Sequence, residues 1–236
     1  MNDKAQDIFS IKGKVACVTG ASSGIGRYAA RYLTSKGAQV IALARRKDQL
    51  ETLKAECGES LSFVQVDIAD IQGLEALAAK VSSFYGAPHI LINAAGLNGR
   101  QYADDVSHEV WQQTLDINVS APFFLAQAFV PAMRAQGWGR IVNFASLQSF
   151  RAFTNGIAYG ASKGAVAQMT RAMAEAWSAQ GINANAIAPG FFETELTKAV
   201  FADKERAQRN AQQTCIGRNG VMSDLEGPLQ FLCSEA

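Results

Sequence analysis

The sequence predicts an α/β fold in which a doubly wound parallel sheet is flanked by helices on both faces. Short apolar segments alternate with longer helical patterns along all 236 residues, an order typical of parallel strands joined by crossover helices. The short segments are apolar throughout rather than at alternate positions, as expected of strands covered on both faces. The sequence contains no linker and no repeat, so we predict a single domain over residues 1–236.

The predicted elements follow one another in strict alternation. Strands are expected at 14–19, 38–43, 61–66, 89–93, 139–145 and 183–188. Helices are expected near 24–36, 47–57, 70–85, 107–136, 158–180 and 203–213. The last strand has weak strand propensity and is inferred from its position in the pattern. Pro122 lies inside the longest helix, where it offers no N–H to the carbonyl of Asn118, so we predict a kink at this point.

The composition argues against several classes of partner. Net charge is +1, and no run of Lys or Arg suggests a surface for nucleic acid or an anionic membrane. No apolar segment approaches the ~20 residues needed to cross a bilayer. The four cysteines and two histidines match no metal motif, so we predict no metal site and a reduced, cytoplasmic protein. The partner that remains is a small molecule.

A glycine-rich turn, Thr19 to Gly26, joins the first predicted strand to the first predicted helix. Glycine allows close approach to phosphate, and the N–H groups at a helix N-terminus attract a pyrophosphate. This context predicts a Rossmann-type dinucleotide site. The second strand ends at Ala44, which cannot accept from a ribose hydroxyl, and is followed by Arg45, which suits a 2′-phosphate, so NADP(H) is favoured over NAD(H). Asp67 either accepts from the adenine or caps a turn.

Tyr159 and Lys163 lie four residues apart, on one face of a predicted helix. A nearby ammonium lowers the pKa of a tyrosine and makes it a usable acid or base. Ser146 follows the fifth strand, at the sheet edge where α/β proteins bind ligands, and can donate to a substrate oxygen. Asn118 either supports a water near Lys163 or only makes local hydrogen bonds. The group predicts hydride transfer between a nicotinamide and a carbonyl or alcohol.

Taken together, these motifs resemble the short-chain dehydrogenase/reductase family, from about Lys12 to Ala236. The resemblance implies that Asn118, Ser146, Tyr159 and Lys163 are catalytic. The cofactor-binding residues that it and the turn imply are Gly20, Ser22, Ser23, Gly24, Ile25, Gly26, Arg45, Asp67, Ile68, Asn93, Ala94, Ala95, Gly96, Tyr159, Lys163, Pro189, Gly190, Phe192 and Thr194. It also implies a homotetramer or homodimer, assembled through the long helices at 107–136 and 158–180. Family members usually continue into a final C-terminal strand, which is apparently missing after Ala236.

Loops at the strand ends are expected to select the substrate. Arg100 and Arg151 are candidate carboxylate anchors, each with the alternative of a surface charge. Phe191 is a candidate wall of the pocket, and Gln148 joins Ser146 among the candidate contacts. The stretches 146–151 and 190–192 are similar to gluconate 5-dehydrogenase-like members, which implies a sugar acid or polyol as substrate. Two alternatives stay open, a 3-oxoacyl-carrier-protein reductase and a catalytically silent, cofactor-binding regulatory member.

Overall fold

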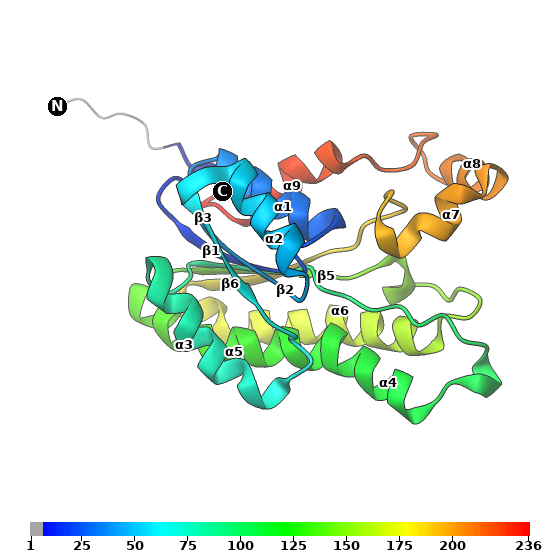
Figure 1. The fold of residues 1–236 in the computed structure, drawn as a ribbon, viewed down its shortest axis with the longest axis horizontal. Helices are drawn as coiled ribbons and strands as arrows, with labels where there is room; N and C mark the ends of the chain where they lie inside the picture. Colours follow the sequence, from blue (N-terminus) through cyan, green and yellow to red (C-terminus); the bar gives the residue numbers. More distant parts are fainter. Residues whose placement is uncertain (1–6) are drawn as a thin grey trace.

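The computed structural model describes residues 7–236 and contains a sheet of parallel strands between two layers of helices (Figure 1). The strands are β1 (Val15–Thr19), β2 (Gln39–Ala44), β3 (Leu61–Gln65), β4 (Ile90–Asn93), β5 (Gly139–Phe144) and β6 (Ile182–Ile187). They lie in the order β3-β2-β1-β4-β5-β6. This order confirms the doubly wound fold. The chain reverses direction across the sheet between β1 and β4, and this is the position at which such sheets bind ligands.

Helices cover both faces of the sheet (Figure 1). One layer holds α1 (Gly24–Ser35), α2 (Lys47–Cys57) and α9 (Glu226–Leu232), and the opposite layer holds α3 (Leu74–Tyr85), α4 (His108–Leu115), α5 (Ala121–Gln136) and α6 (Ile157–Trp177). Each layer has its own apolar core. Leu33, Leu50 and Leu229 pack on one face of the sheet, and Val81 and Phe129 pack on the other. Because both faces are covered, the strand side chains are buried on each side, as their uniform apolar sequence predicts.

The longest predicted helix, 107–136, forms as two α-helices joined by a wider π-helical turn at Asp116–Ser120. Pro122 follows this turn in the first positions of α5. A π-turn accommodates one extra residue, and such turns occur where a helix carries functional groups. The helix is therefore irregular just before Pro122, and the predicted kink itself stays a prediction. By length and composition alone, His108–Gln136 is the one helix of the described chain that could cross a membrane, and it is partly buried inside the protein.

The structure differs from the sequence prediction in the helices after β6. The segment after β6 contains α7 (Lys198–Ala202) and α8 (Lys204–Gln212), whereas only one helix at 203–213 was expected. Residues 226–232 form α9, an element that the sequence pattern did not indicate. Within residues 7–236, β5 is the only strand that pairs with β6.

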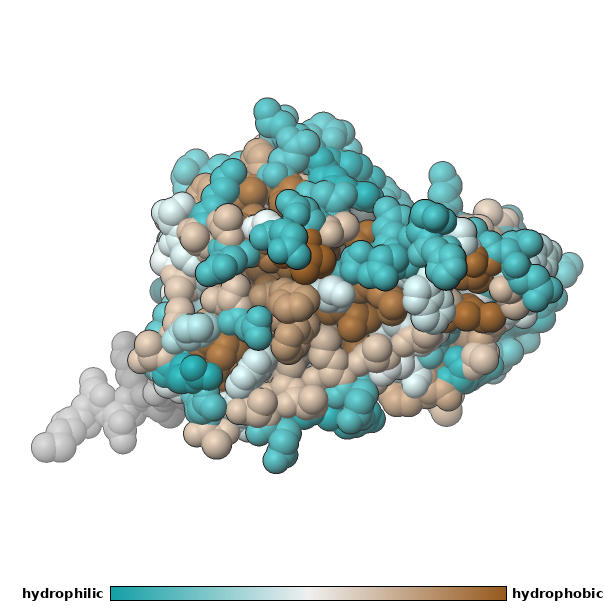
Figure 2. All heavy atoms as spheres, turned by 90° about the horizontal axis from the view of Figure 1, so that it is seen from below, coloured by the Kyte–Doolittle hydropathy of each residue, from teal (hydrophilic) through white to brown (hydrophobic). Residues whose placement is uncertain are grey.

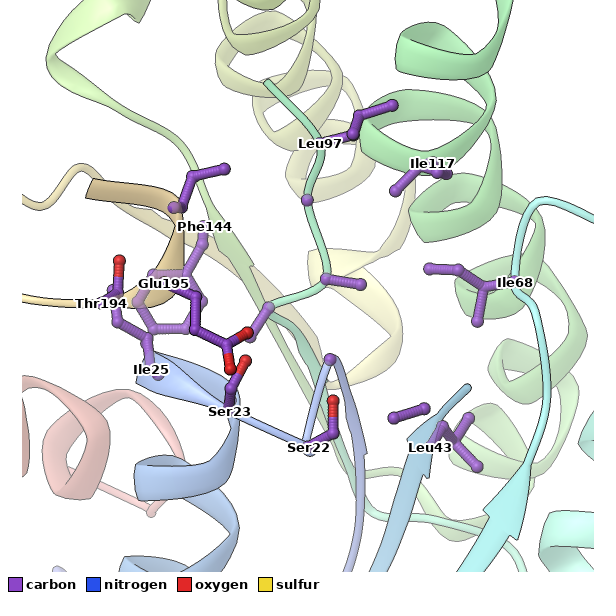
Figure 3. Close-up of a pocket in the computed structure, with 18 of the residues that line it drawn as sticks. Ser22, Ser23, Ile25, Leu43, Ile68, Leu97, Ile117, Phe144, Thr194 and Glu195 are labelled. Carbon is purple, nitrogen blue, oxygen red and sulfur yellow. The ribbon is translucent and has the colours of Figure 1, made fainter. Parts of the chain in front are cut away.

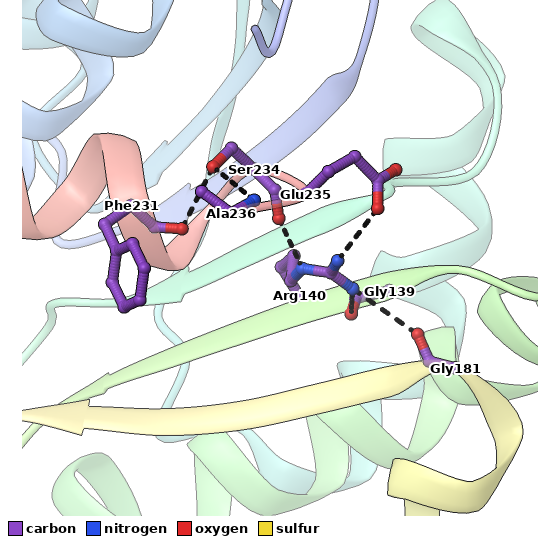
Figure 4. Close-up of polar contacts among 7 residues, drawn as sticks. All are labelled: Gly139, Arg140, Gly181, Phe231, Ser234, Glu235 and Ala236. Atoms are coloured by element: carbon purple, nitrogen blue, oxygen red, sulfur yellow. Dashed lines mark hydrogen bonds and ion pairs between the residues drawn. The ribbon is translucent and has the colours of Figure 1, made fainter. Parts of the chain in front are cut away.

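The last residues lie on the side of the sheet covered by α1 and α9, beside the start of β5 (Figure 1). Arg140, on β5, is buried and donates from Nε to the carbonyl of Ser234 at 2.8 Å (Figure 4). Its Nη2 lies 3.4 Å from the Glu235 carboxylate. The N–H groups of Glu235 and Ala236 both donate to the carbonyl of Ile8. These contacts hold residues 234–236 against the start of β5 and leave the carboxyl edge of the sheet to the functional site.

Candidate active site

Two adjoining cavities open at the carboxyl ends of the strands. The first measures about 520 Å³ and runs along the glycine-rich turn and the ends of β2, β3 and β4 (Figure 3). The second measures about 370 Å³ and is enclosed by the loops after β5 and β6 and by α7 and α8. Tyr159, Pro189 and Thr194 line both cavities. A ligand in the first cavity and a ligand in the second would therefore meet beside Tyr159.

The glycine-rich turn brings backbone close to backbone at the floor of the first cavity. Gly20 has φ +70°, and a Cβ on it would lie 2.7 Å from the backbone of Ala95. A Cβ on Gly26 would collide with the carbonyl of Gly20. A side chain at position 20 would thus push the turn away from the loop after β4. A side chain at position 26 would push the start of α1 away from the turn. The turn keeps its shape only with glycine at both positions.

The N-terminus of α1 has no cap from its own side chains. Ser23 is the N-cap residue, but its side chain makes no capping hydrogen bond, and none of the described residues of the first turn is acidic. The first N–H groups of a helix lack partners within the helix and carry the positive end of its dipole. With these groups facing the first cavity, the turn fits the pyrophosphate of a dinucleotide.

Charged side chains form the outer rim of this cavity. Arg45 lies 3.8 Å from the carboxylate of Asp67 and is largely exposed. Asp67 also accepts from the N–H of Ala69, which is the turn-capping role considered above; contact with an adenine stays a prediction. Arg46 was not predicted as a site residue. It donates to the hydroxyl of Ser22 and, at 2.8 Å, to the carboxylate of Glu195.

The side chains of Ser146, Tyr159 and Lys163 lie where the two cavities meet. Ser146 and Tyr159 line the second cavity, and Tyr159 and Lys163 line the first. The Ser146 hydroxyl accepts from the N–H of Gln148 at 3.2 Å, which fixes it at the start of the loop after β5. Lys163 is buried, and its Nζ donates to the carbonyl of Phe144 at 2.5 Å and lies 5.6 Å from the ring centre of Tyr159.

Burial dominates the protonation of these groups. It raises the pKa of Tyr159, against smaller lowering effects from a hydrogen bond with Ser146 and the charge of Arg100. Burial also lowers the pKa of Lys163 to about 8. The expected lowering of the tyrosine pKa by Lys163 is therefore not the dominant effect in this structure. The lysine ammonium is itself disfavoured by burial, because a charged group loses its hydration there.

Asn118 and Asn93 are both buried and both hold secondary structure together. Asn118 accepts from the N–H of Leu97 at 2.8 Å and donates to the carbonyl of Leu97 and to Ser162 Oγ, each at 2.9 Å. Asn93 donates at 2.8 Å to Asn143, its neighbour on β5. The Asn118 amide thus bonds to segments 21 and 44 positions away in the sequence rather than to its own helix, and a water near Lys163 stays a prediction. Gly96 lies beside it, since a Cβ there would be 3.6 Å from Asn118 Oδ1 and 3.9 Å from Lys163 Nζ.

The second cavity has a polar part and an apolar part. Its amide side chains are Asn98, Gln148 and Asn155, and its aromatic walls are Phe153, Phe191 and Phe192. Two cations also line it, Arg100 and Arg206, whereas its lining contains no Asp or Glu among the described residues. Arg206, from α8, was missed by sequence reasoning, because one arginine in a polar helix carries no local signal that it faces a cavity.

The structure brings most of the predicted site residues together. Of the predicted cofactor residues, Asn93, Gly190 and Phe192 do not line the first cavity as described; Gly190 and Phe192 line the second, and Asn93 lies within the sheet. Arg151 lines neither cavity within the described chain, and its guanidinium lies 5.0 Å from the ring centre of Phe153. Of its two expected roles, the surface charge agrees with this exposed position.

A family model described as short chain dehydrogenase matches residues 14–205. That match covers the glycine-rich turn, the residues where the two cavities meet and all six strands of the described sheet. The chain belongs to the short chain dehydrogenase family. It is a nicotinamide-dependent oxidoreductase, in agreement with the N-terminus of α1 at the first cavity and the Ser–Tyr–Lys group beside it.

The similarity to known relatives extends over nearly the whole chain. Gluconate 5-dehydrogenase of Gluconobacter oxydans is 37% identical over 234 residues, which are 98% of this chain and 91% of the relative. An NAD-dependent glycerol dehydrogenase of Listeria innocua is 36% identical, over 97% of this chain and 89% of the relative. The crystal structure of a gluconate 5-dehydrogenase from Burkholderia cenocepacia, in complex with NADP and tartrate, is 33% identical, with a TM-score of 0.90 over 97% of this chain and 91% of that one.

Proposed function

We propose that this dehydrogenase interconverts a hydroxyl and a carbonyl group of a sugar acid, with NADP(H) as cofactor. The observation that carries the proposal is the charge of the second cavity. Arg100 and Arg206 line it, and no acidic side chain of the described residues does so. Guanidinium groups bind carboxylates through paired, charge-assisted hydrogen bonds. A substrate with a carboxylate would be held there more tightly than a neutral polyol of the same length.

The amides of the cavity suit the hydroxyl groups of a sugar chain. The side-chain oxygens of Asn98 and Gln148 are buried and make no hydrogen bond within the described residues. A buried polar atom without a partner costs free energy, which a donor on a ligand would recover. Sugar hydroxyls are such donors. The relatives with gluconate and deoxygluconate dehydrogenase names agree with this substrate class.

Cofactor preference is the finer part of the proposal. The end of β2 offers Ala44 and two arginines, and no carboxylate that would accept from a ribose 2′-hydroxyl. An arginine here suits a 2′-phosphate. The relatives include an NAD-dependent glycerol dehydrogenase as well as a structure in complex with NADP. The residues of this chain therefore carry the argument for NADP(H), and Arg45 and Arg46 are the side chains that would bind the phosphate.

The chain's own residues would manage the proton. A bound nicotinamide supplies or accepts the hydride at the substrate carbon. Ser146 donates a hydrogen bond to the reacting oxygen and stabilises its developing charge. Tyr159 Oη gives a proton to that oxygen in reduction and takes one in oxidation. Lys163, whose Nζ donates to the Phe144 carbonyl, lines the first cavity and would hold the nicotinamide ribose there; its ammonium form would favour the phenolate, against the effect of burial. Asn118 positions the loop at Leu97, which lines the first cavity.

The test compares a sugar acid with an alditol that lacks its carboxylate, and adds a thioester substrate for the alternative function. Purified protein is assayed with NADP and NAD on gluconate, on the neutral alditol glucitol and, in reverse, on a 3-oxoacyl thioester, with Tyr159→Phe as control. We expect NADP-linked turnover of a sugar acid that exceeds turnover of the alditol and is lost in the variant. Turnover of the thioester alone would favour the carrier-protein reductase alternative. No turnover in either protein, with NADPH bound, would favour the silent member.

Two further expectations stay predictions. A homotetramer or homodimer would use the long helices expected at 107–136 (α4 and α5) and 158–180 (α6), and its size can be measured directly. The cytoplasmic location is supported only by the four reduced cysteines of the described chain. Neither affects the chemistry proposed for the two cavities.

A further inference from the structure

One ion pair joins opposite walls of the cofactor cavity. Arg46 precedes α2 on the wall formed by β2, whereas Glu195 follows β6 in the segment that leads to α7. Both residues line the first cavity. Arg46 Nη1 lies 2.8 Å from Glu195 Oε1, although the two residues are separated by 149 positions in the sequence. The pair therefore crosses the cavity at its rim.

The same guanidinium is also tied to the glycine-rich turn. Arg46 Nε and Nη2 donate to the hydroxyl of Ser22, at 3.2 and 3.0 Å. Glu195 approaches the neighbouring Ser23, and Figure 3 shows the Glu195 carboxylate beside the Ser23 side chain. The carboxylate thus occupies a place between an arginine and the N-terminus of α1. Both are groups that bind phosphate.

We propose that Glu195 is a specificity-determining residue for the cofactor, because its carboxylate occupies on Arg46 the place that the 2′-phosphate of NADP(H) takes on binding. This inference rests on the NADP(H) preference proposed above. A phosphate brings more oxygen acceptors and more charge than a carboxylate, so it displaces Glu195 from the guanidinium. NADH has only a hydroxyl at that position and leaves the ion pair intact. Glu195 consequently reduces the affinity for NADP(H) by competing for Arg46.

The displaced residue leads directly to the substrate cavity. Thr194 and Leu196, on either side of Glu195, line both cavities, and Thr197 and Val200 line the second. Release of Glu195 from Arg46 removes the one ion pair that joins this segment to the β2 wall within the described chain. NADP(H) would therefore loosen the wall of the substrate cavity, and NADH would not.

The test is a cycle of variants in the full chain. Dissociation constants for NADPH and NADH are measured by fluorescence titration for the wild type, Glu195→Gln, Arg46→Gln and the double variant. The control is Glu193→Gln, an exposed carboxylate two residues away that lines neither cavity in the described part of the chain. The readout is the ratio of the NADH constant to the NADPH constant. The ratio cancels any uniform effect of a variant on the fold or on the pyrophosphate.

We expect Glu195→Gln to raise the ratio roughly two- to fivefold, the size expected for a partly exposed ion pair. Glu193→Gln should leave it unchanged, and Glu195→Gln should have no effect in the Arg46→Gln background. Equal tightening of both cofactors by Glu195→Gln would overturn the proposal, since it would reflect only the loss of a negative charge. An equal change of the ratio with and without Arg46 would overturn it as well. A wild-type ratio below one would instead overturn the proposed cofactor preference.

Discussion

The side-chain amide of Asn118 pairs with both main-chain polar groups of Leu97, in the way that one strand of a sheet pairs with the next. Its Oδ1 accepts from the N–H at 2.8 Å and its Nδ2 donates to the carbonyl at 2.9 Å. A third bond, to Ser162 Oγ, connects the amide to α6, one residue before Lys163. One buried amide thus positions both the loop after β4, along the cofactor cavity, and the helix that carries Tyr159.

Asn118→Ala is expected to lower the free energy of unfolding by about 3 kcal/mol, because two main-chain groups and a hydroxyl lose a buried partner at roughly 1 kcal/mol or more each. Chemical denaturation of wild type and variant measures the change in the free energy of unfolding. The matched control is Asn183→Ala, at an exposed position of β6, which should stay within about 0.5 kcal/mol of the wild type. Equal effects at the two positions would show that the Asn118 bonds contribute no more stability than an exposed side chain.

Arg206→Gln is expected to lower kcat/KM for a sugar acid by about 10-fold or more, as for the loss of a charge-assisted hydrogen bond. Turnover of the neutral alditol should change little. Arg209→Gln is the control, because Arg209 lies on the same helix, pairs with Glu205 at 3.7 Å and lines neither cavity within the described residues. If Arg206→Gln reduces both activities alike, the arginine supports the helix rather than the carboxylate.

Lys163→Met tests the cost of a buried amine. The pKa of Lys163 falls to about 8 in the folded protein, from its usual value of 10.5, so the unfolded chain binds more protons between these values. Stability contributed by this group therefore rises as pH increases from 8 to 10.5, by up to roughly 3 kcal/mol. Unfolding free energies of wild type and variant are measured at several pH values. The value for the wild type minus that for the variant should increase across this window, because only the wild type contains the titrating amine. A constant difference would mean that Lys163 is charged in the folded state throughout.

Phe124→Arg should lower the mass of the assembly measured by light scattering. Phe124 is 41% exposed on α5, and Figure 2 shows apolar residues gathered on the face to which the α3–α6 layer belongs. Phe84→Arg is the control, because Phe84 is equally exposed, at 40%, but lies on α3, outside the two long helices expected at the interface. An unchanged mass for both variants would place the interface elsewhere or show a monomer.

Much of this fold follows from the sequence, because its signals are local. Each strand is a short apolar run. The glycine-rich turn directly follows the first strand and Ser146 follows the fifth, so both were predicted to lie at the carboxyl edge of the sheet. Tyr159 and Lys163 share a helix face because four residues separate them. Contacts between distant segments were not predictable in this way. Glu195 meets Arg46 only through the path of the chain after β6, and Arg206 reaches the substrate cavity only because α8 folds over it.

The direction of the Tyr159 pKa shift was also not predictable from the spacing of Tyr159 and Lys163. The residues near Tyr159 suggested a lowered pKa, yet the burial of its ring outweighs them. Burial depends on the whole packed structure, and a motif of five residues does not contain it. Arg151 is a similar case, since its position in the loop gave no indication that its guanidinium would lie against Phe153 rather than in the cavity.

The π-helical turn at Asp116–Ser120 makes this part of the chain intolerant of changes in length. Removing one residue would convert the wide turn into a regular helical turn, and α4 and α5 would keep their phase because the wide turn holds the one extra residue. The side chains within the turn would change direction, and Asn118 would turn away from Leu97. Single-residue deletions between 116 and 120 should therefore abolish activity, whereas deletions in the exposed stretch 102–105, which lines neither cavity within the described residues, should be tolerated. A scan of one-residue deletions through 98–125 would trace that boundary directly in the gene.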